Sequence, residues 1–325
     1  MKTRAELIGL ANATDFRPEA LEKVYRLLAI LRRLSDNELS RGQWVLKGGS
    51  AINLFHLNAP RLSIDIDINF TGVKDVSQLG SARDVFERVL VASCAREDCS
   101  VKRAPAEHAG GKFRLRFPSL HGGQQNLEVD VSYVARIPLF GVEGRLCSLS
   151  GLVGNHPVPL LTLTELAAGK FTALSTRSAA RDYYDALSLT EYEPAVLETP
   201  QFRVAFLCQV ASSRSDLRRT EAPQTLGRRE VEQKLIPLLR IKSSTAQLGA
   251  SALLEKLNEV VTPVFQKLVQ WSEEEKRFLD AFLDSGEIAP HHLTDDKDLQ
   301  ARISEQSMLL WKQMHVRKHL GLDSE

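Results

Sequence analysis

Apolar residues recur with two different periods along the chain, and the period changes at about residue 40. Residues 1–40 have helical spacing, which predicts a helical scaffold that packs one side against the structure that follows. That apolar side consists of Leu21, Val24, Leu27, Leu28 and Leu31. From Trp44 to about Val134, short strand-like runs alternate with one or two helical segments, which is typical of an α/β or α+β domain.

Helical patterns dominate the second half of the chain, after the Gly- and Pro-containing stretch from Gly141 to Pro159. Two sequences in this half are typical of capping boxes, T-x-x-E from Thr162 to Glu165 and S-x-x-E from Ser272 to Glu275. We therefore expect a first domain of α/β or α+β type followed by a mainly α-helical C-terminal domain. The expected domains are 1–155, with its scaffold at 1–40 and its core at 44–135, and 156–325.

The most regular alternation lies between Arg61 and Ile68. Successive side chains of a β-strand point to opposite faces, so this run predicts one apolar and one polar face. The apolar face consists of Leu62, Ile64, Ile66 and Ile68. The polar face consists of Arg61, Ser63, Asp65 and Asp67, so two carboxylates lie side by side.

Neighbouring carboxylates on one face repel each other unless a cation lies between them. Mg²⁺ prefers oxygen ligands and usually binds through one or two carboxylates together with the phosphates of a substrate. Asp65 and Asp67 are therefore candidate metal ligands and catalytic residues, for Mg²⁺ or alternatively Mn²⁺. The other interpretation is an edge strand with a solvated polar face, because D-x-D often occurs by chance.

A glycine turn precedes this strand. Lys47, Gly48, Gly49 and Ser50 lie between a strand-like run and a short helical run that begins at Ala51. Glycine permits a positive φ and lets a ligand approach the backbone. Ser50 is expected to cap the helix, where the helix dipole favours an anion. The four residues are thus candidates for nucleotide binding, and the alternative is an ordinary strand-to-helix turn.

The order of these elements resembles the signature of the polymerase-β-type nucleotidyltransferases, in which the serine holds triphosphate oxygens and the acids hold metal. Those enzymes use a third carboxylate from a neighbouring strand. The alternating run from Asn126 to Tyr133 places Glu128 and Asp130 on one polar face. We expect Asp130 to be the third metal ligand and catalytic acid, with Glu128 as the alternative. A half-exposed strand with two surface acids is the simpler interpretation.

Lys170 lies within the apolar stripe of a predicted helix, four residues after one leucine and four before another. Such a lysine either extends past the core to water or points its ammonium group at phosphates in a cleft between the domains. The sequence S-T-R-S-A-A-R-D-Y-Y-D follows, and in it Arg177 is a candidate nucleotide-binding residue. Asp182 and Asp185 are three residues apart, so either can hold Lys170 or accept a proton.

Four segments together resemble the AbiEii/AbiGii nucleotidyltransferase toxins, which include the mycobacterial MenT toxins. They are L-K-G-G-S-A-I-N-L-F at Leu46–Phe55, R-L-S-I-D-I-D-I-N-F at Arg61–Phe70, L-E-V-D-V-S-Y at Leu127–Tyr133 and T-E-L-A-A-G-K-F-T-A-L-S-T-R-S-A-A-R-D-Y-Y-D at Thr164–Asp185. The resemblance implies an α+β fold with a nucleotidyltransferase-type mixed sheet flanked by helices, in which residues 44–135 are the catalytic core. It also places Ser63, Asp65, Lys170 and Asp185 on positions that the family uses for catalysis or nucleotide binding.

The resemblance implies transfer of a nucleoside monophosphate from an NTP. In the best-understood members the acceptor is the 3′ end of tRNA, and the transfer stops aminoacylation and translation. The partners implied are an NTP, an RNA acceptor and a separate antitoxin protein. Two alternatives remain open: the same transfer to a protein or a small molecule, and a non-catalytic module that senses NTP.

Composition narrows these possibilities. The chain has 325 residues with 42 Lys and Arg against 41 Asp and Glu, so its net charge of +1 gives no overall preference for a polyanion. Any binding of nucleic acid must then come from a local patch. The four cysteines form no C-x-x-C pair, and no apolar run approaches the roughly 20 residues that span a bilayer. We expect a cytoplasmic protein with free thiols and no membrane partner.

Overall fold

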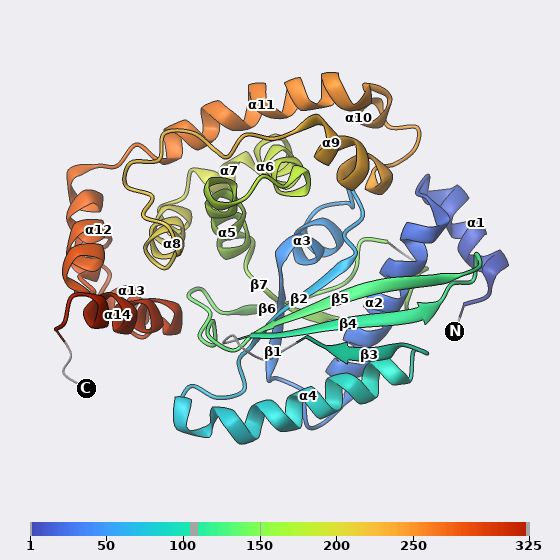
Figure 1. Cartoon of the computed structure of the whole chain (residues 1–325), viewed down its shortest axis with the longest axis horizontal. Coiled ribbons are helices and arrows are strands. Elements are labelled where there is room, and N and C mark those ends of the chain that lie inside the picture. Colours follow the sequence, from blue (N-terminus) through green and yellow to red (C-terminus); the bar gives the residue numbers. More distant parts are fainter. Residues whose placement is uncertain (1, 105–109, 150, 323–325) are drawn as a thin grey trace. The chain divides into compact units, whose positions relative to one another are not determined.

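The computed structural model describes residues 2–104, 110–149 and 151–322, and the chain forms two compact units. Unit 1 comprises residues 1–136, 142–161 and 229–253. Unit 2 comprises residues 137–141, 162–228 and 254–325. Each unit is therefore assembled from segments that are far apart in the sequence (Figure 1). The expected domain boundary at residue 155 stays a prediction.

A mixed sheet forms the centre of unit 1. The described residues supply seven strands in the order β3-β4-β5-β2-β1-β7-β6. β2 pairs with β5 and β1 with β7 in parallel, and the other neighbours are antiparallel. The predicted α+β class with a mixed sheet is confirmed. The strands are β1 (Trp44–Lys47), β2 (Asp65–Phe70), β3 (Ser100–Arg103), β4 (Gly110–Pro118), β5 (Gln124–Ser132), β6 (Val142–Arg145) and β7 (Val158–Leu161).

Helix α4 (Leu79–Ala95) covers the apolar face of the β3, β4, β5 and β2 part of the sheet (Figure 1). The rings of Phe86 in α4 and Phe70 in β2 have centroids 5.2 Å apart. The hydroxyl of Tyr133, directly after β5, donates to the Glu87 carboxylate at 3.1 Å. Because side chains alternate along a strand, the residues between these inward-facing positions project from the opposite face of the sheet.

Helix α2 (Pro18–Asp36) belongs to unit 1, and its Arg26 guanidinium lies 4.3 Å from the ring centroid of Phe117 in β4. The five apolar residues predicted for this helical segment are all buried, which confirms the helical period of the N-terminal region. The other helical elements that lie within unit 1 are α1 (Arg4–Thr14), α3 (Gly48–Ala51), η1 (Ile52–His56), η2 (Val76–Gln78), η3 (Val231–Leu235), η4 (Ile236–Leu238) and α10 (Ser244–Gln247).

Unit 2 is helical, as predicted for the second half of the chain. The ring of Phe171 in α5 (Leu163–Thr176) meets Phe202 of α8 (Pro200–Ala211) edge to face, with centroids 6.1 Å apart. Its other helices are α6 (Ala180–Tyr192), α7 (Pro194–Leu197), α12 (Glu273–Ser285), η5 (Pro290–His292), α13 (Lys297–Ser304) and α14 (Ser307–His319). α9 (Arg228–Glu230) and α11 (Gly249–Leu268) each include residues of both units.

The two predicted capping boxes have different outcomes. At the start of α12, Ser272 and Glu275 form both reciprocal hydrogen bonds, so this box is confirmed. At the start of α5, the Thr162 hydroxyl accepts from the Glu165 backbone N–H. The Glu165 carboxylate instead accepts hydrogen bonds from the backbone N–H groups of Leu139 and Phe140 at 2.9 and 3.0 Å. Only half of the second box is therefore present.

The carboxylate strand is shorter than predicted, because β2 begins at Asp65. Arg61 is predicted on the polar face, but it is buried and its guanidinium donates to the Leu62 carbonyl at 2.8 Å. Arg61 and Leu62 pair with Leu239 and Leu238 of a distant segment. Because of that pairing, residues 61–64 lie outside β2, and the predicted strand is wrong for them.

One further prediction needs correction. Ser50 lies inside α3, whose N-cap residue is Lys47, so Ser50 does not cap the helix. β6 and the start of β7 lie within the stretch from Gly141 to Pro159. No helix in the described part of the chain has the length and apolar character needed to cross a bilayer. All four cysteines are free thiols, as the sequence predicted.

Candidate active site

Two pairs of acidic residues lie side by side across β2 and β5. The parallel register places Asp65 opposite Glu128 and Asp67 opposite Asp130. Residues that are opposite each other in a sheet project from the same face, on strands about 4.8 Å apart. Phe70 belongs to the alternate set that faces α4, so all four carboxylates project from the other face. The structure thus brings the three predicted acids and the alternative, Glu128, together.

Gly48 lies directly against the Asp67 carboxylate. Its φ of +71° is in the left-handed region, and a Cβ on this residue would stand 2.9 Å from Asp67 Cγ. Residues with a Cβ rarely adopt such a φ, and carbon atoms do not approach each other so closely. Lys47 is the antiparallel partner of Asp67, so both project from one face. Glycine at position 48 therefore serves the backbone conformation and the space that Asp67 occupies.

The Ser50 hydroxyl is buried and serves the backbone. It donates to the Asp65 carbonyl at 2.5 Å, and its oxygen lies 3.1 Å from the Ser63 hydroxyl, which is also buried. The Asn53 side-chain amide donates to the Gly49 carbonyl at 2.9 Å. These hydrogen bonds tie the glycine turn to the start of β2. The predicted contacts of Gly49, Ser50 and Ser63 with a nucleotide stay predictions.

Lys112 of β4 is a cation of this face that the sequence prediction missed. Its Nζ lies 2.9 Å from a Glu128 oxygen and 3.7 Å from an Asp130 oxygen. The hydrogen bond to Glu128 raises the pKa of Lys112. Arg114 also approaches Glu128 at 3.6 Å, so Glu128 is the more firmly neutralised of the two acids. Lys112 and Arg114 alternate with buried apolar residues, so the sequence pattern alone predicts that both lie on the polar face of a strand.

Lys23 of α2 is a second cation that the sequence prediction missed. Burial lowers the pKa of Lys23, and the negative charge of Asp65 partly opposes this change. Lys23 is therefore close enough to Asp65 for an electrostatic interaction. A lysine among charged residues of an amphipathic helix is ordinary, so no pattern in the sequence indicates this contact.

The other predicted residues gather in unit 2. The Lys170 ammonium lies 2.7 Å from an oxygen of Asp182 and 2.7 Å from an oxygen of Asp185. All three side chains are buried, and two of the three donors of Lys170 are directed to these carboxylates. Lys170 does not extend past the core to water. The prediction that one or both aspartates hold it is confirmed.

Arg177 completes this cluster at the surface of unit 2. Its Nε lies 2.6 Å from Asp182, and 61% of the Arg177 side chain is exposed. Burial alone would raise the pKa of Asp182, but the positive charges of Lys170 and Arg177 outweigh burial and lower it to about 2. Two cations and two anions therefore balance, which is the condition for burying charge at a tolerable free energy. The predicted roles of Lys170, Arg177 and Asp185 toward a nucleotide stay predictions.

The carboxylates of unit 1 are candidate ligands for a divalent metal ion, and the predicted metal site stays a prediction. Among the described residues, no three His, Cys, Asp or Glu side chains are placed to hold a metal ion by themselves. Mg²⁺ commonly takes one or two protein carboxylates and completes its coordination with water and substrate phosphates. The oxygen donors of Asp65, Asp67 and Asp130 therefore fit an ion that arrives with a triphosphate.

The fold is similar to that of a solved nucleotidyltransferase toxin. MenT4, a nucleotidyltransferase toxin from Mycobacterium tuberculosis H37Rv, matches with a TM-score of 0.54 over 94% of this chain and 99% of its own chain, at 17% sequence identity. At this identity the likeness concerns the fold alone. No match to the chain was found among curated proteins.

The sequence model of one family, described as the nucleotidyl transferase AbiEii toxin of a type IV toxin–antitoxin system, matches residues 29–304. The match contains the glycine turn, β2, β5 and the Lys170 helix. The chain belongs to the AbiEii nucleotidyltransferase toxin family, which confirms the resemblance seen in the motifs. Membership implies an NTP substrate and an antitoxin partner.

Proposed function

We propose that this protein transfers a nucleoside monophosphate from an NTP to the 3′ end of an RNA, most specifically tRNA, in a reaction that requires Mg²⁺. The observation that carries the proposal is the register of β2 and β5, which sets Asp65, Asp67 and Asp130 on one face beside the glycine turn. Family membership supports the transfer, and the motif resemblance supports tRNA as the acceptor. Blocked tRNA ends would then stop aminoacylation and translation in the cytoplasm.

Asp65, Asp67 and Asp130 would hold the metal. Mg²⁺, or alternatively Mn²⁺, supplies neutralisation of the α- and β-phosphates and lowers the pKa of the acceptor hydroxyl when it is bound there. The geometry supports Asp130 over Glu128, because Asp130 stands opposite Asp67 and Glu128 is paired with Lys112 and Arg114. Glu128 then serves to position those two cations.

The reaction is a substitution at phosphorus. The 3′ hydroxyl oxygen of the acceptor attacks the α-phosphorus, the bond between that phosphorus and the β-phosphate bridging oxygen breaks, and pyrophosphate leaves. The hydroxyl proton is lost to solvent. Lys47 and the backbone of the Gly48–Ser50 turn orient the triphosphate, since catalysis of this type depends on positioning and charge neutralisation.

Lys170, Arg177 and Asp185 are proposed to contribute to nucleotide binding. The exposed guanidinium of Arg177 offers the cleanest test, because its replacement leaves the buried Lys170 pairs in place. Arg177→Gln should raise the KM for NTP at least about fivefold and change kcat less, as expected for removal of a ground-state contact. An unchanged KM would exclude Arg177 from the nucleotide site.

The test of the function uses the full chain with each of the four NTPs labelled at the α-phosphate, Mg²⁺, total RNA and total protein. The label should appear in RNA, should disappear after RNase treatment and should require the divalent ion. Oxidation of the RNA 3′ diols with periodate should abolish it. Asp65→Ala serves as the inactive control.

Each other outcome selects a different function. Label in the protein pool would indicate a protein-modifying transferase, and label in a low-mass product would indicate a small-molecule acceptor. NTP binding without release of pyrophosphate would indicate a non-catalytic nucleotide sensor. RNA labelling that survives periodate oxidation would exclude the 3′ end.

A further inference from the structure

Basic side chains extend the carboxylate face of the unit 1 sheet across β4 and β3. Arg114 of β4 is opposite Glu128, and Lys102 of β3 is opposite Arg114. Arg116 lies two residues further along β4, so it projects from the same face. These three residues, Lys102, Arg114 and Arg116, form the basic strip.

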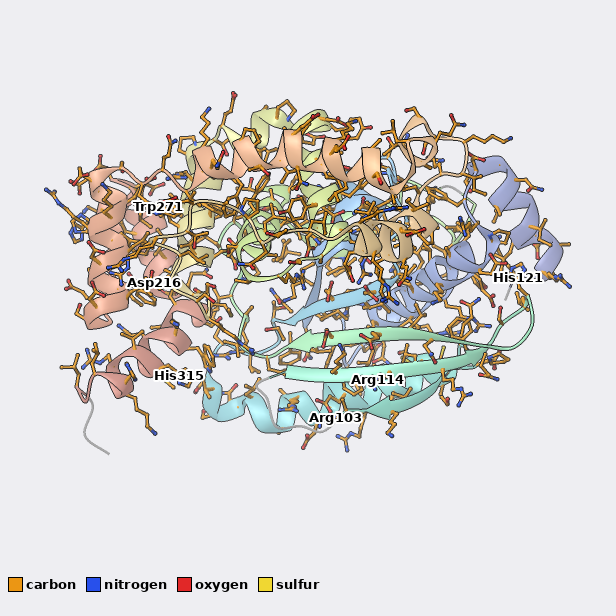
Figure 2. The ribbon with its side chains drawn as sticks, turned by 45° about the horizontal axis from the view of Figure 1, so that its top comes forward. Arg103, Arg114, His121, Asp216, Trp271 and His315 are labelled. Atoms are coloured by element: carbon orange, nitrogen blue, oxygen red, sulfur yellow. The ribbon has the colours of Figure 1, made fainter. Side chains whose placement is uncertain are left out.

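The basic strip is open to solvent. All three side chains are exposed, and Arg114 is exposed to 68%. Among the described residues, Lys102 and Arg116 make no ion pair, whereas Arg103 turns to the other face and lies 2.8 Å from Glu87. Figure 2 shows Arg114 on β4 and Arg103 beside α4. The sheet therefore separates the paired Arg103 on its covered face from Lys102 and Arg116 on its open face, for which the structure gives no ion-pair partner among the residues it describes.

The arrangement has an electrostatic consequence. Like charges directly opposite each other in a sheet destabilise it, and Lys102 faces Arg114 in register. An anion lying across both strands would remove that repulsion. The chain has a net charge of only +1, so long-range attraction of a polyanion has to come from a local group of cations such as this one.

We propose that the basic strip binds the phosphates of the RNA acceptor next to its reacting 3′ end. The proposal rests on the proposed function. A strand whose terminal hydroxyl reaches Asp65 and Asp67 can continue over β5, β4 and β3, since the register connects the acids to the strip without interruption. The distance from β5 to β3 is about 10 Å, so the phosphates of nucleotides next to the reacting end can lie over the strip.

RNA fits this surface better than an acidic protein does. The strip begins at the row of residues that contains Glu128, directly beside the row that contains Asp67 and Asp130. An acceptor must pass close to the carboxylates, whereas a separate acidic partner has no reason to follow their register. Phosphate contacts of this kind carry no base preference, so the strip supports binding of many RNA ends.

The experiment compares two double variants of the full chain. Lys102→Glu/Arg116→Glu reverses the charge of the two strip residues that make no ion pair among the described residues. Arg88→Glu/Arg96→Glu is the matched control, because both arginines are exposed residues of the α4 segment on the other side of the sheet and make the same change in charge. The probe is unfractionated tRNA with a 5′ label, and its affinity is measured without NTP at several salt concentrations. Lys102→Gln/Arg116→Gln is a milder second variant that keeps the test valid if charge reversal impairs folding.

The strip variants should bind tRNA at least about tenfold more weakly than the control, and the slope of log affinity against log salt should decrease by roughly 0.7 for each lost phosphate contact. The affinity for NTP in the absence of RNA should be the same in all proteins. The proposal is overturned if the strip variants bind and label tRNA like the wild type. This holds also if these variants have lost binding to a protein partner. A wild type that neither binds nor labels any RNA overturns the proposed function, and the strip proposal with it.

Discussion

Replacing Gly48 with alanine tests the contact between the glycine turn and Asp67. The new Cβ would stand 2.9 Å from Asp67 Cγ and 3.0 Å from Asp67 Cβ, so the carboxylate or the turn must move. The backbone at position 48 also has a φ of +71°, which alanine adopts only with strain. One substitution therefore imposes two separate costs.

The magnitudes follow from these two effects. The left-handed backbone costs roughly 1–2 kcal/mol for a residue with a Cβ. Overpacking against Asp67 adds about 1–3 kcal/mol, so the variant should lose roughly 2–5 kcal/mol of stability. A shift of about 1 Å in a group that positions the reacting atoms can lower the rate about 100-fold. We expect a loss of that order in transfer by Gly48→Ala.

Gly42→Ala is the matched control. Gly42 has a φ of +73°, and a Cβ at this position would meet no atom of the described residues within 4 Å. Gly42→Ala therefore has the free-energy cost of the left-handed backbone but no collision of its Cβ with another residue. The assay is single-turnover transfer from a labelled NTP, with thermal unfolding of both variants followed in parallel. Gly42→Ala should keep transfer within about twofold of wild type, since its cost lies in stability.

Two results would refute this reasoning. Transfer at the wild-type rate by Gly48→Ala would mean that the position of Asp67 does not matter for catalysis. An equal loss of transfer in Gly42→Ala and Gly48→Ala would mean that backbone strain, and not the collision with Asp67, causes the defect.

Three further predictions concern single carboxylates and one histidine. At saturating NTP, Asp130→Asn should lower the transfer rate roughly 100- to 1000-fold, whereas Glu128→Gln should lower it less than about fivefold. A larger loss in Glu128→Gln than in Asp130→Asn would make Glu128 the third acid. Asp182 has a folded pKa of about 2 against an ordinary value of 3.8, so its stabilisation is complete above about pH 4 and is lost as the pH falls towards 2. By linkage, the free energy of unfolding should fall by roughly 2.5 kcal/mol over this range. The free energy of unfolding of Asp182→Asn, measured between pH 2 and 5, should lack this pH dependence. The same pH dependence in Asp182→Asn and wild type would contradict the lowered pKa. Burial and the charge of Arg145 lower the pKa of His56 to about 4, so its ring resonances should not titrate near pH 6.5 by NMR; a midpoint at pH 6 or above would contradict this.

The strands of the site were predictable because their signal is local. Alternation of polar and apolar residues defines which side chains share a face, and it placed Asp65, Asp67 and Asp130 correctly on the polar sides of β2 and β5. The same pattern in β4 marks Lys112 and Arg114, but a basic run has no distinctive spacing and was not singled out. Local pattern thus predicts faces, and it does not predict which strands become neighbours.

The parts that escaped prediction depend on distant contacts. Arg61 leaves the strand because residues near Leu239, far along the chain, pair with it. Ser50 is typical of a helix cap by residue type, yet its hydroxyl donates a hydrogen bond to the Asp65 carbonyl. The edge strand β6 consists of four residues with no alternation in burial, so it has no periodic signal at all. In each case tertiary contacts override a local preference.

The most direct test of the central claim is single-turnover transfer of a labelled nucleotide to tRNA by Asp65→Ala, with wild-type folding verified by circular dichroism. If Asp65 helps to bind the metal and the triphosphate on the face shared by β2 and β5, the rate should fall at least about 1000-fold at any concentration of Mg²⁺. Transfer by Asp65→Ala at the wild-type rate would contradict the claim.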